Sequence, residues 1–365
     1  MRSLLELDES QLVAWLQEQG EPRYRAAQIR RWVFERRAED FESMNDLPKS
    51  LRARLAEHFV LWQGEIDVHS RATDGTEKLL LKWPSGAKIE CVLIREGDRR
   101  TICISSQVGC AMGCVFCASG LDGVERNLSH AEIVEQMLRL QRLLPADERL
   151  SHIVVMGMGE PLANLDNVLV ALREANAKTG LDISARRITI STVGLPPALR
   201  RLTQEEPRYH LAVSLHAPND ALRSEIVPVN RKIGIEAVME AADDYFEASG
   251  RRLTFEYVLL GQLNDSPQHA RELAALLRGR TALLNVIPYN PVAGLPYKTP
   301  SPEAIDRFRG ELEQRGINVQ FRQRKGDEIN AACGQLRRAT QGTIPSKGTI
   351  PSKSTVPLSR PTTES

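Results

Sequence analysis

The first 62 residues alternate apolar and polar positions with the spacing of amphipathic helices. Asp8 or Ser10 can cap a first helix, because either side chain can accept a hydrogen bond from a backbone N–H of the first turn. Two further helices are predicted over residues 26–34 and 48–60. Residues 1–62 are therefore expected to form a small helical module.

From residue 63 to 96 the pattern changes to short apolar runs separated by turn dipeptides. Asp74-Gly75 and Ser85-Gly86 are typical of hairpin turns, since glycine readily adopts the positive φ that such turns need. The predicted strands cover residues 66–72, 78–83 and 88–94. We expect this β-segment to connect the helical module to the rest of the chain.

Residues 97–339 alternate short β-type runs with helical stretches, the pattern of repeated β/α units. The predicted strands cover residues 101–105, 152–156, 187–191, 210–215, 254–260, 282–288 and 317–321. Helices are predicted near residues 129–143, 164–178, 235–248, 268–277 and 302–315. Such units form a parallel sheet or barrel, and the functional site is expected at the C-terminal ends of its strands.

Residues 340–365 contain a repeated GTIPSK segment and are rich in Pro, Ser and Thr. This composition buries too little apolar surface to order itself, so we expect a disordered tail and assign it no function.

Composition limits the class of protein. The 365 residues are 42% hydrophobic, yet no run approaches the roughly 20 apolar residues of a membrane helix. The acidic N-terminal region does not resemble a signal peptide, so a cytoplasmic protein with no membrane contact is expected. Lys and Arg (48) nearly balance Asp and Glu (47), so net charge does not indicate a nucleic-acid partner. Six cysteines in such a chain suggest metal binding or catalysis more than structural disulfides.

Cys110, Cys114 and Cys117 form a CxxxCxxC loop that follows the first strand of the β/α region. Three thiolates on a four-iron cluster leave one iron open, which can bind the amino and carboxylate groups of S-adenosylmethionine. A zinc site is the alternative, with Cys103 or Cys91 as the fourth ligand, but the chain has no second CxxC pair. The spacing therefore favours one 4Fe-4S cluster and adenosylmethionine as cofactors.

Polar and small residues recur at the ends of the later strands, where a barrel places its ligands. The Gly-rich segment 156–161 allows backbone approach to a ligand and offers an acceptor for an ammonium group. Each residue also has a structural explanation, such as capping a turn, bracing neighbouring prolines or filling the core. The candidate adenosylmethionine contacts are Gly159, Glu160, Ser191, Ser214, Leu215, His216 and Asn290.

From about Glu90 to Leu336 the chain resembles the RlmN/Cfr family of radical adenosylmethionine RNA methyltransferases. The shared segments, in order, are SSQVGCAMGCVFC, RNL, MGMGEP, SLHAPND, EIVPVN, IPYNP and GDEINAACGQL. The resemblance implies a partial (β/α)6 TIM-like barrel of the radical SAM class, with the helical module as an RNA-binding accessory domain. It also implies a monomer that methylates C2 of adenine in 23S ribosomal RNA, and in many members an adenine beside the anticodon of transfer RNA.

The resemblance assigns further roles to three residues. In the family's mechanism, Cys333 takes a methyl group from one adenosylmethionine, and a second molecule yields a 5′-deoxyadenosyl radical that removes hydrogen from that methyl group. The methylene radical then adds to the adenine, Glu90 accepts the C2 proton, and Cys103 attacks the Cys333 sulfur to release the product. The resulting disulfide needs an external reductant, and the cluster needs an external electron donor. Cys91 matches no catalytic position and is expected to be structural, while Glu90 could instead be a solvent-facing strand residue.

Three other interpretations concern the substrate. A Cfr-like enzyme would use the same cysteines but methylate adenine C8, and a non-catalytic iron-sulfur RNA-binding factor would keep the fold without the reaction. The basic residues of the helical module, which alternate with aromatic ones, are candidate RNA contacts, as are three residues near Cys333. The candidates are Arg23, Arg25, Arg30, Arg31, Arg36 and Arg37 in the module, and Arg322, Arg324 and Lys325 near Cys333.

Overall fold

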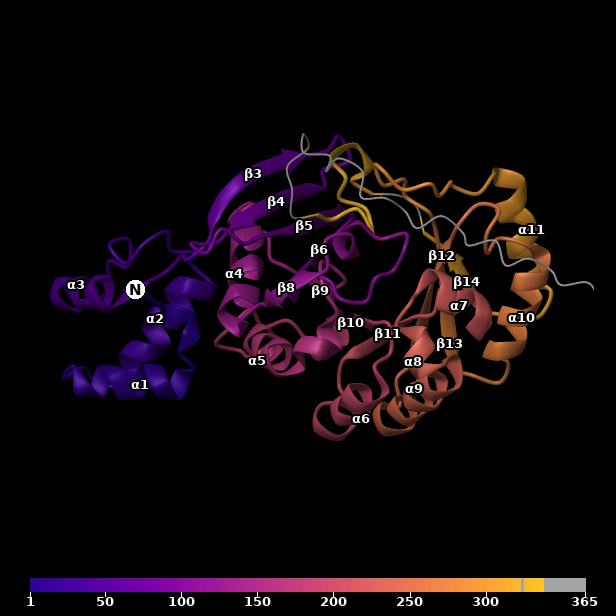
Figure 1. Ribbon diagram of the computed structural model, residues 1–365. Helices are drawn as coiled ribbons and strands as arrows, with labels where there is room; N and C mark the ends of the chain where they lie inside the picture. The colour runs from indigo at the N-terminus through magenta and orange to yellow at the C-terminus, as the bar shows by residue number, and fades with distance from the viewer. Residues whose placement is uncertain (323–324, 338–365) are drawn as a thin grey trace, which may run out of the picture.

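The computed structural model describes residues 1–322 and 325–337 (Figure 1). Arg324 and the predicted tail at 340–365 lie outside the described residues. The N-terminal part comprises β1 (Arg2–Ser3), η1 (Leu4–Glu6), α1 (Glu9–Glu18), α2 (Tyr24–Phe34), α3 (Lys49–His58) and β2 (Phe59–Val60). Asp8 caps α1 as expected, with its side chain accepting from the Gln11 backbone N–H. The third helix ends earlier than predicted, because residues 59–60 pair with β1 as a short parallel strand.

The β-segment forms β3 (Glu65–Arg71), β4 (Glu77–Lys82) and β5 (Lys88–Glu96), joined by the two predicted glycine turns. Gly75 and Gly86 have φ of +80° and +85°, as tight hairpins require. β5 pairs antiparallel with β6 (Arg99–Cys103), so this segment is continuous with the sheet of the β/α region. Within the described residues the sheet has ten strands.

The expected β/α barrel is confirmed. Its strands pair in parallel in the order of the chain, and the last predicted strand, at residues 317–321, forms β14 at the edge. The strands after β6 are β9 (His152–Val155), β10 (Ile188–Thr192), β11 (His210–Ser214), β12 (Leu253–Leu259), β13 (Ala282–Pro288) and β14 (Val319–Phe321). The helices are α4 (His130–Gln141), α5 (Leu165–Asn176), α6 (Pro196–Glu205), α7 (Asp220–Ile226), α8 (Asn230–Ile233), α9 (Ile235–Ser249), α10 (Pro267–Leu277) and α11 (Pro302–Glu313).

The larger helices line the outer side of the curved sheet (Figure 1), which leaves the strand ends open for a site. Short 3-10 turns complete the connections: η2 (Ala118–Gly120), η3 (Pro161–Asn164), η4 (Ala185–Arg187) and η5 (Asp327–Ile329). Sequence patterns alone did not predict a two-stranded ribbon, β7 (Gln107–Gly109) with β8 (Val124–Asn127), which encloses the cysteine loop.

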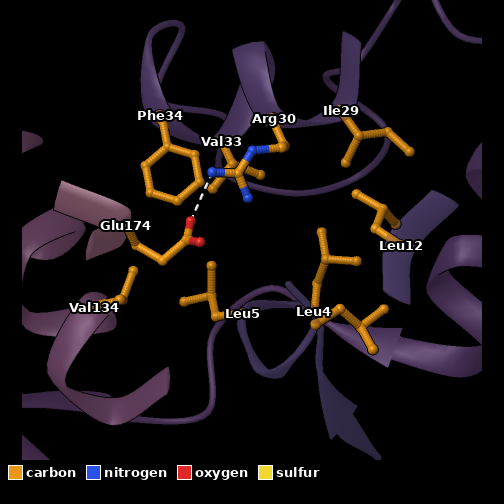
Figure 2. A pocket seen from close by; sticks show the side chains of 10 residues that line it. Leu4, Leu5, Leu12, Ile29, Arg30, Val33, Phe34, Val134 and Glu174 are labelled. Carbon is orange, nitrogen blue, oxygen red and sulfur yellow. Dashed lines mark hydrogen bonds and ion pairs between the residues drawn. The ribbon is translucent and has the colours of Figure 1, made fainter. Parts of the chain in front are cut away.

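The helical module packs against the barrel through charged as well as apolar contacts. Arg30 is buried on α2, and its Nη2 lies 2.6 Å from Oε2 of Glu174 on α5 (Figure 2). Leu5, Phe34 and Val134 line the small pocket around this ion pair. No helix in the described part of the chain is long and apolar enough to cross a membrane.

Candidate functional site

The three cysteines of the CxxxCxxC loop lie between β7 and β8, and each is partly exposed. The loop starts where the Cys110 backbone N–H donates to the Gly123 carbonyl (3.0 Å). Burial raises the pKa of the Cys110 thiol to about 12, and hydrogen bonds from the backbone N–H groups of Met112 and Gly159 oppose that shift. Burial also raises the pKa of Cys117, against backbone hydrogen bonds from Ser119 and Gly120.

Backbone donors aimed at sulfur stabilise thiolates, which are the form that binds iron. Cys114 lies close enough to both other thiols for their charges to raise its pKa, after burial as the main cause. Three sulfurs from one loop, with amide donors directed at two of them, fit the ligand set of an iron-sulfur cluster.

The loop is held against helix α7 and the end of β11. The Val115 N–H donates to the Ile226 carbonyl (3.1 Å). The Phe116 ring meets His216 edge-on, with ring centroids 4.9 Å apart. These contacts connect the cysteine loop to the strand ends that carry the candidate adenosylmethionine contacts.

Glu160 is buried directly after the Gly-rich segment. Its Oε1 accepts from the Leu162 N–H (3.0 Å) and the Thr192 hydroxyl (2.6 Å), and its Oε2 accepts from the Val193 N–H (2.9 Å). Burial raises its pKa. A carboxylate has about four acceptor positions, so one remains for an ammonium donor. With no cation bonded to it among the described residues, Glu160 is suited to bind one.

Gly159 brings this segment close to the cysteine loop. Its φ is +103°, and a Cβ there would lie 2.6 Å from Gln107 Cβ and 2.7 Å from the Gln107 backbone nitrogen. The Gln107 side chain in turn accepts from the Glu160 N–H (2.8 Å). Only glycine allows both this backbone conformation and this approach.

Ser191 and Ser214 lie on the neighbouring parallel strands β10 and β11, with their hydroxyl oxygens 3.4 Å apart. Leu215 is fully buried and contributes its backbone, which donates to the Glu256 carbonyl (3.0 Å). The two hydroxyls and this backbone therefore lie at one end of the sheet, as expected from the strand pattern.

His216 has a φ of +61°, and its Nδ1 accepts from the Val258 N–H (3.1 Å). Burial lowers its pKa to about 3, with a further contribution from the Arg223 charge. Its imidazole is therefore neutral, with the proton on Nε2. Asn290 is buried, and its Nδ2 donates to the Cys333 carbonyl (3.1 Å), while its Oδ1 has no hydrogen-bond partner among the described residues. That oxygen is available to a ligand.

Cys103 and Cys333 are 230 residues apart in sequence but lie in the same site. Cys103 is buried at the end of β6, and Cys333 is exposed on the segment after β14. Burial raises the pKa of Cys103 to about 12, and the charge of the Cys333 thiolate raises it further. The Arg322 guanidinium donates to the Cys333 sulfur at 3.9 Å. Arg322 thus points toward Cys333 inside the site, so it does not belong to an outer RNA-binding surface.

Glu90 is buried, which rules out the alternative of a solvent-facing strand residue. Its Oε1 lies 2.7 Å from the Lys78 Nζ, and its Oε2 accepts from the Arg337 N–H at 2.7 Å. Burial raises its pKa, while Lys78 and the Arg337 amide oppose the shift. The carboxylate is therefore bonded to one cation and to a backbone amide of the segment that carries Cys333.

The tip of the β3–β4 hairpin fixes that segment. The Thr73 hydroxyl donates to Glu328 Oε1 (2.7 Å), and the Gly326 N–H donates to Asp74 Oδ2 (3.0 Å). The Lys78 Nζ also donates to the Asn330 carbonyl (3.1 Å). Sequence reasoning missed these contacts, since nothing in the local pattern of residues 73–78 indicates a partner about 250 positions away.

A second group missed from the sequence lies inside the barrel. Glu256 of β12 is buried, and both its carboxylate oxygens accept from the Asn285 side-chain amide (3.0 and 2.8 Å). Burial raises its pKa, and the Arg322 charge opposes this. A charged residue within the apolar strand 253–259 was the available signal.

Cys91 lies outside this group. Val92, its neighbour on β5, pairs with Cys103, and side chains alternate between the faces of a strand. Cys91 therefore points to the opposite face, where it is fully buried near Glu135 and Arg139 of α4.

Of the six basic candidates in the helical module, Arg25 is partly buried beside Glu21 (3.7 Å), and the other five divide into two sets. Arg30 is buried against Glu174, and the Arg37 Nη1 donates to the Leu144 carbonyl (2.7 Å), so both anchor the module to the barrel. Arg23 and Arg31 are exposed, and Arg36 stacks over the Trp32 ring at 4.5 Å. Only the second set is accessible to RNA without rearrangement.

Comparisons with known proteins match both parts of the chain. Residues 2–61 match the model of the ribosomal RNA large subunit methyltransferase N-terminal domain, and residues 104–274 match the radical SAM superfamily. The "Probable dual-specificity RNA methyltransferase RlmN" of Rhodopirellula baltica is 68% identical over 335 residues, covering 92% of this chain and 90% of that protein. The protein of the same name from Symbiobacterium thermophilum is 47% identical, covering 88% and 87%.

A solved structure is similar over nearly the whole chain. The crystal structure of a radical SAM methyltransferase from Sphaerobacter thermophilus superimposes with a TM-score of 0.90 at 44% sequence identity. The match covers 93% of this chain and 100% of that one.

Proposed function

The chain belongs to the RlmN family of radical SAM RNA methyltransferases, and we propose that it methylates C2 of adenine in 23S ribosomal RNA and beside the anticodon of transfer RNA. Aromatic C2 of adenine is neither acidic nor nucleophilic, so a polar methyl transfer from adenosylmethionine fails there. A reaction through a protein-bound methyl group and a radical avoids that difficulty. Ribosomal RNA as substrate also implies a cytoplasmic protein.

The observation that carries this proposal is the meeting of Cys333, Cys103 and Glu90 at one end of the sheet. Cys333 holds the transferred methyl group, and the Arg322 guanidinium lies beside its sulfur at 3.9 Å. Cys103 lies close enough to interact with the Cys333 charge, as a residue that attacks that sulfur must. Glu90 supplies the carboxylate that accepts the C2 proton.

The cofactor residues fit the same arrangement. The four-iron cluster and adenosylmethionine are required by the family, and when bound they supply the methyl group and the one-electron chemistry. Cys110, Cys114 and Cys117 would hold the cluster. Glu160, with one free acceptor position, would bind the ammonium group of adenosylmethionine, and the Asn290 oxygen without a partner would accept from the same ligand.

The hairpin contacts give Lys78 a positioning role. Its ammonium group bonds both the Glu90 carboxylate and the Asn330 carbonyl, so it links the base to the segment that carries Cys333. Both Glu90 oxygens are occupied by Lys78 and the Arg337 amide. Because a carboxylate has about four acceptor positions, Glu90 keeps acceptor positions for a substrate proton beside these two bonds.

We further propose that residues 1–62 form an RNA-binding domain, with residues 63–96 as the connection and 97–339 as the methyltransferase barrel. The exposed basic residues in and beside α2, Arg23, Arg31 and Arg36, support phosphate contact, since such contacts position RNA without reading its bases. The proposal also includes an external electron donor for the cluster and an external reductant for the Cys103–Cys333 disulfide. The protein is proposed to act as a monomer.

Mass spectrometry of RNA digests tests the reaction. RNA lacking the modification is incubated anaerobically with reconstituted protein, adenosylmethionine and reductant, and 2-methyladenosine is expected. A product containing 8-methyladenosine alone would instead assign the Cfr-type reaction. The Cys333→Ser variant is the matched control, because it keeps the cluster ligands and loses the methyl carrier.

A further inference from the structure

Arg223 on α7 is a fully buried cation, with none of its surface exposed. Burial lowers its pKa to about 10, so the guanidinium remains charged at neutral pH. A buried charge is costly unless an opposite charge or a metal centre compensates it. The charge of Arg223 therefore needs a compensating group close to it.

The hydrogen-bond partners of Arg223 are all uncharged. They are the carbonyl of Leu215 (3.0 Å), the side-chain oxygen of Asn230 (2.6 Å) and the carbonyls of Val193 (2.6 Å) and Ser214 (3.0 Å). In residues 1–322 and 325–337, no carboxylate forms an ion pair with this side chain. Asp220 is reached only through Asn230, whose amide donates to the exposed Asp220 carboxylate at 2.7 Å.

Arg30, the buried arginine of the helical module, differs from Arg223 in the charge of its partners. Arg30 lies within 2.6 Å of a Glu174 oxygen and 3.8 Å of a Glu9 oxygen. Both arginines are buried, but only Arg30 has direct carboxylate partners. The uncharged hydrogen-bond partners of Arg223 therefore do not balance its positive charge.

A group that can carry a negative charge and that interacts with Arg223 lies on the cysteine loop. Among its charged neighbours, Cys114 has the largest effect, favouring the charged guanidinium. A backbone contact also joins the cysteine loop to the helix that carries Arg223, because the Val115 N–H donates to the Ile226 carbonyl on that helix. A four-iron cluster on three thiolates carries net negative charge, and one-electron reduction adds to it.

We infer that the iron-sulfur cluster with its three thiolates is the counterion of Arg223, and that this guanidinium favours both retention and reduction of the cluster. The inference rests on the cluster assignment of the proposed function and is independent of the RNA substrate. A nearby cation in a medium of low dielectric stabilises the more negative, reduced state most. Arg223 acts here through charge and does not bind iron.

A purely structural role is the competing explanation. Arg223 bonds the Val193 carbonyl, and the Val193 N–H bonds Glu160, so its loss could disturb the site without any charge effect. Arg223→Met removes the charge, whereas Arg223→Lys keeps it with fewer hydrogen bonds. The two variants separate the explanations.

The test is a redox titration of the reconstituted cluster by electron paramagnetic resonance, without RNA. In Arg223→Met we expect reduction to be about tenfold less favourable, about 59 mV more negative for one electron, and a smaller gain in melting temperature on cluster loading. Arg223→Lys should keep a potential near that of the parent. Equal potentials for Met and parent, or equal shifts for Met and Lys, would overturn the inference.

Two further variants complete the experiment. Asp220→Asn removes an exposed negative charge that is linked to Arg223 through Asn230, so it should make the cluster easier to reduce. An unchanged or more negative potential in this variant would contradict the inference. This readout remains if Arg223→Met does not fold. Arg30→Met should lower the stability of cluster-free and loaded protein alike and leave the potential unchanged. A parent protein that assembles no four-iron cluster would instead refute the proposed function.

Discussion

Replacement of Gly159 by alanine tests whether close packing at the cysteine loop sets the affinity for adenosylmethionine. At φ of +103°, the new Cβ would lie 2.6 Å from Gln107 Cβ and 2.7 Å from both the Gln107 nitrogen and the Ser106 hydroxyl oxygen. Two of these contacts involve backbone or Cβ atoms, which cannot rotate away. The segment that ends in Glu160 must therefore move away from Ser106 and from strand β7, which precedes Cys110.

The expected cost has two parts. A left-handed backbone for a non-glycine residue costs about 1–2 kcal/mol, and overpacking a tight site costs about 1–3 kcal/mol. Together the free energy of unfolding should fall by about 2–5 kcal/mol. Displacement of Glu160 should also weaken adenosylmethionine binding by about tenfold or more, equivalent to about 1.4 kcal/mol.

Gly250 provides the matched control. It has a φ of +62° at the end of α9, and an added Cβ would meet no atom within 4 Å. Gly250→Ala should therefore lose only the backbone part, about 1–2 kcal/mol, with unchanged ligand affinity. Denaturant unfolding and calorimetric titration of adenosylmethionine measure both quantities. Equal losses of stability in the two variants, with equal affinities, would refute the packing argument.

Three further predictions concern the reaction and the RNA. Lys78→Met should raise the pKa of Glu90 further, because burial already raises it and Lys78 opposes that shift; the carboxylate then forms only at higher pH, and the acid limb of the pH–rate profile should move upward. A Cys103→Ser variant should accumulate a covalent protein–RNA adduct through Cys333, visible on a denaturing gel; its absence would speak against resolution by this thiol. Arg31→Ala should weaken RNA binding in filter assays by severalfold at low salt and leave stability within about 0.5 kcal/mol, whereas unchanged binding would remove α2 from the RNA surface.

The strand and loop patterns of the sequence predicted much of the fold. Alternating β/α runs identified the barrel because each parallel strand is buried on both faces and reads as a continuous apolar run. Turn dipeptides located both hairpins, and the CxxxCxxC spacing identified the candidate cluster loop. Short elements such as residues 59–60 and the ribbon around the cysteine loop escaped prediction, since their pairing partners are distant or their strands too brief to show a period.

Side-chain roles depended on the tertiary structure. The sequence identified three cysteines as candidate cluster ligands by spacing alone, because they lie on one loop. It could not show that Lys78 bonds Glu90 or that Glu328 is fixed by Thr73 across 255 positions. Nor could it show that Arg223 is a buried cation with no carboxylate partner in the part of the chain that the structure describes. These facts follow from contacts between distant segments and from burial, which local patterns of residues do not encode. Residue types and spacing therefore determined which chemistry the chain can host, and packing decided which charges and donors surround it.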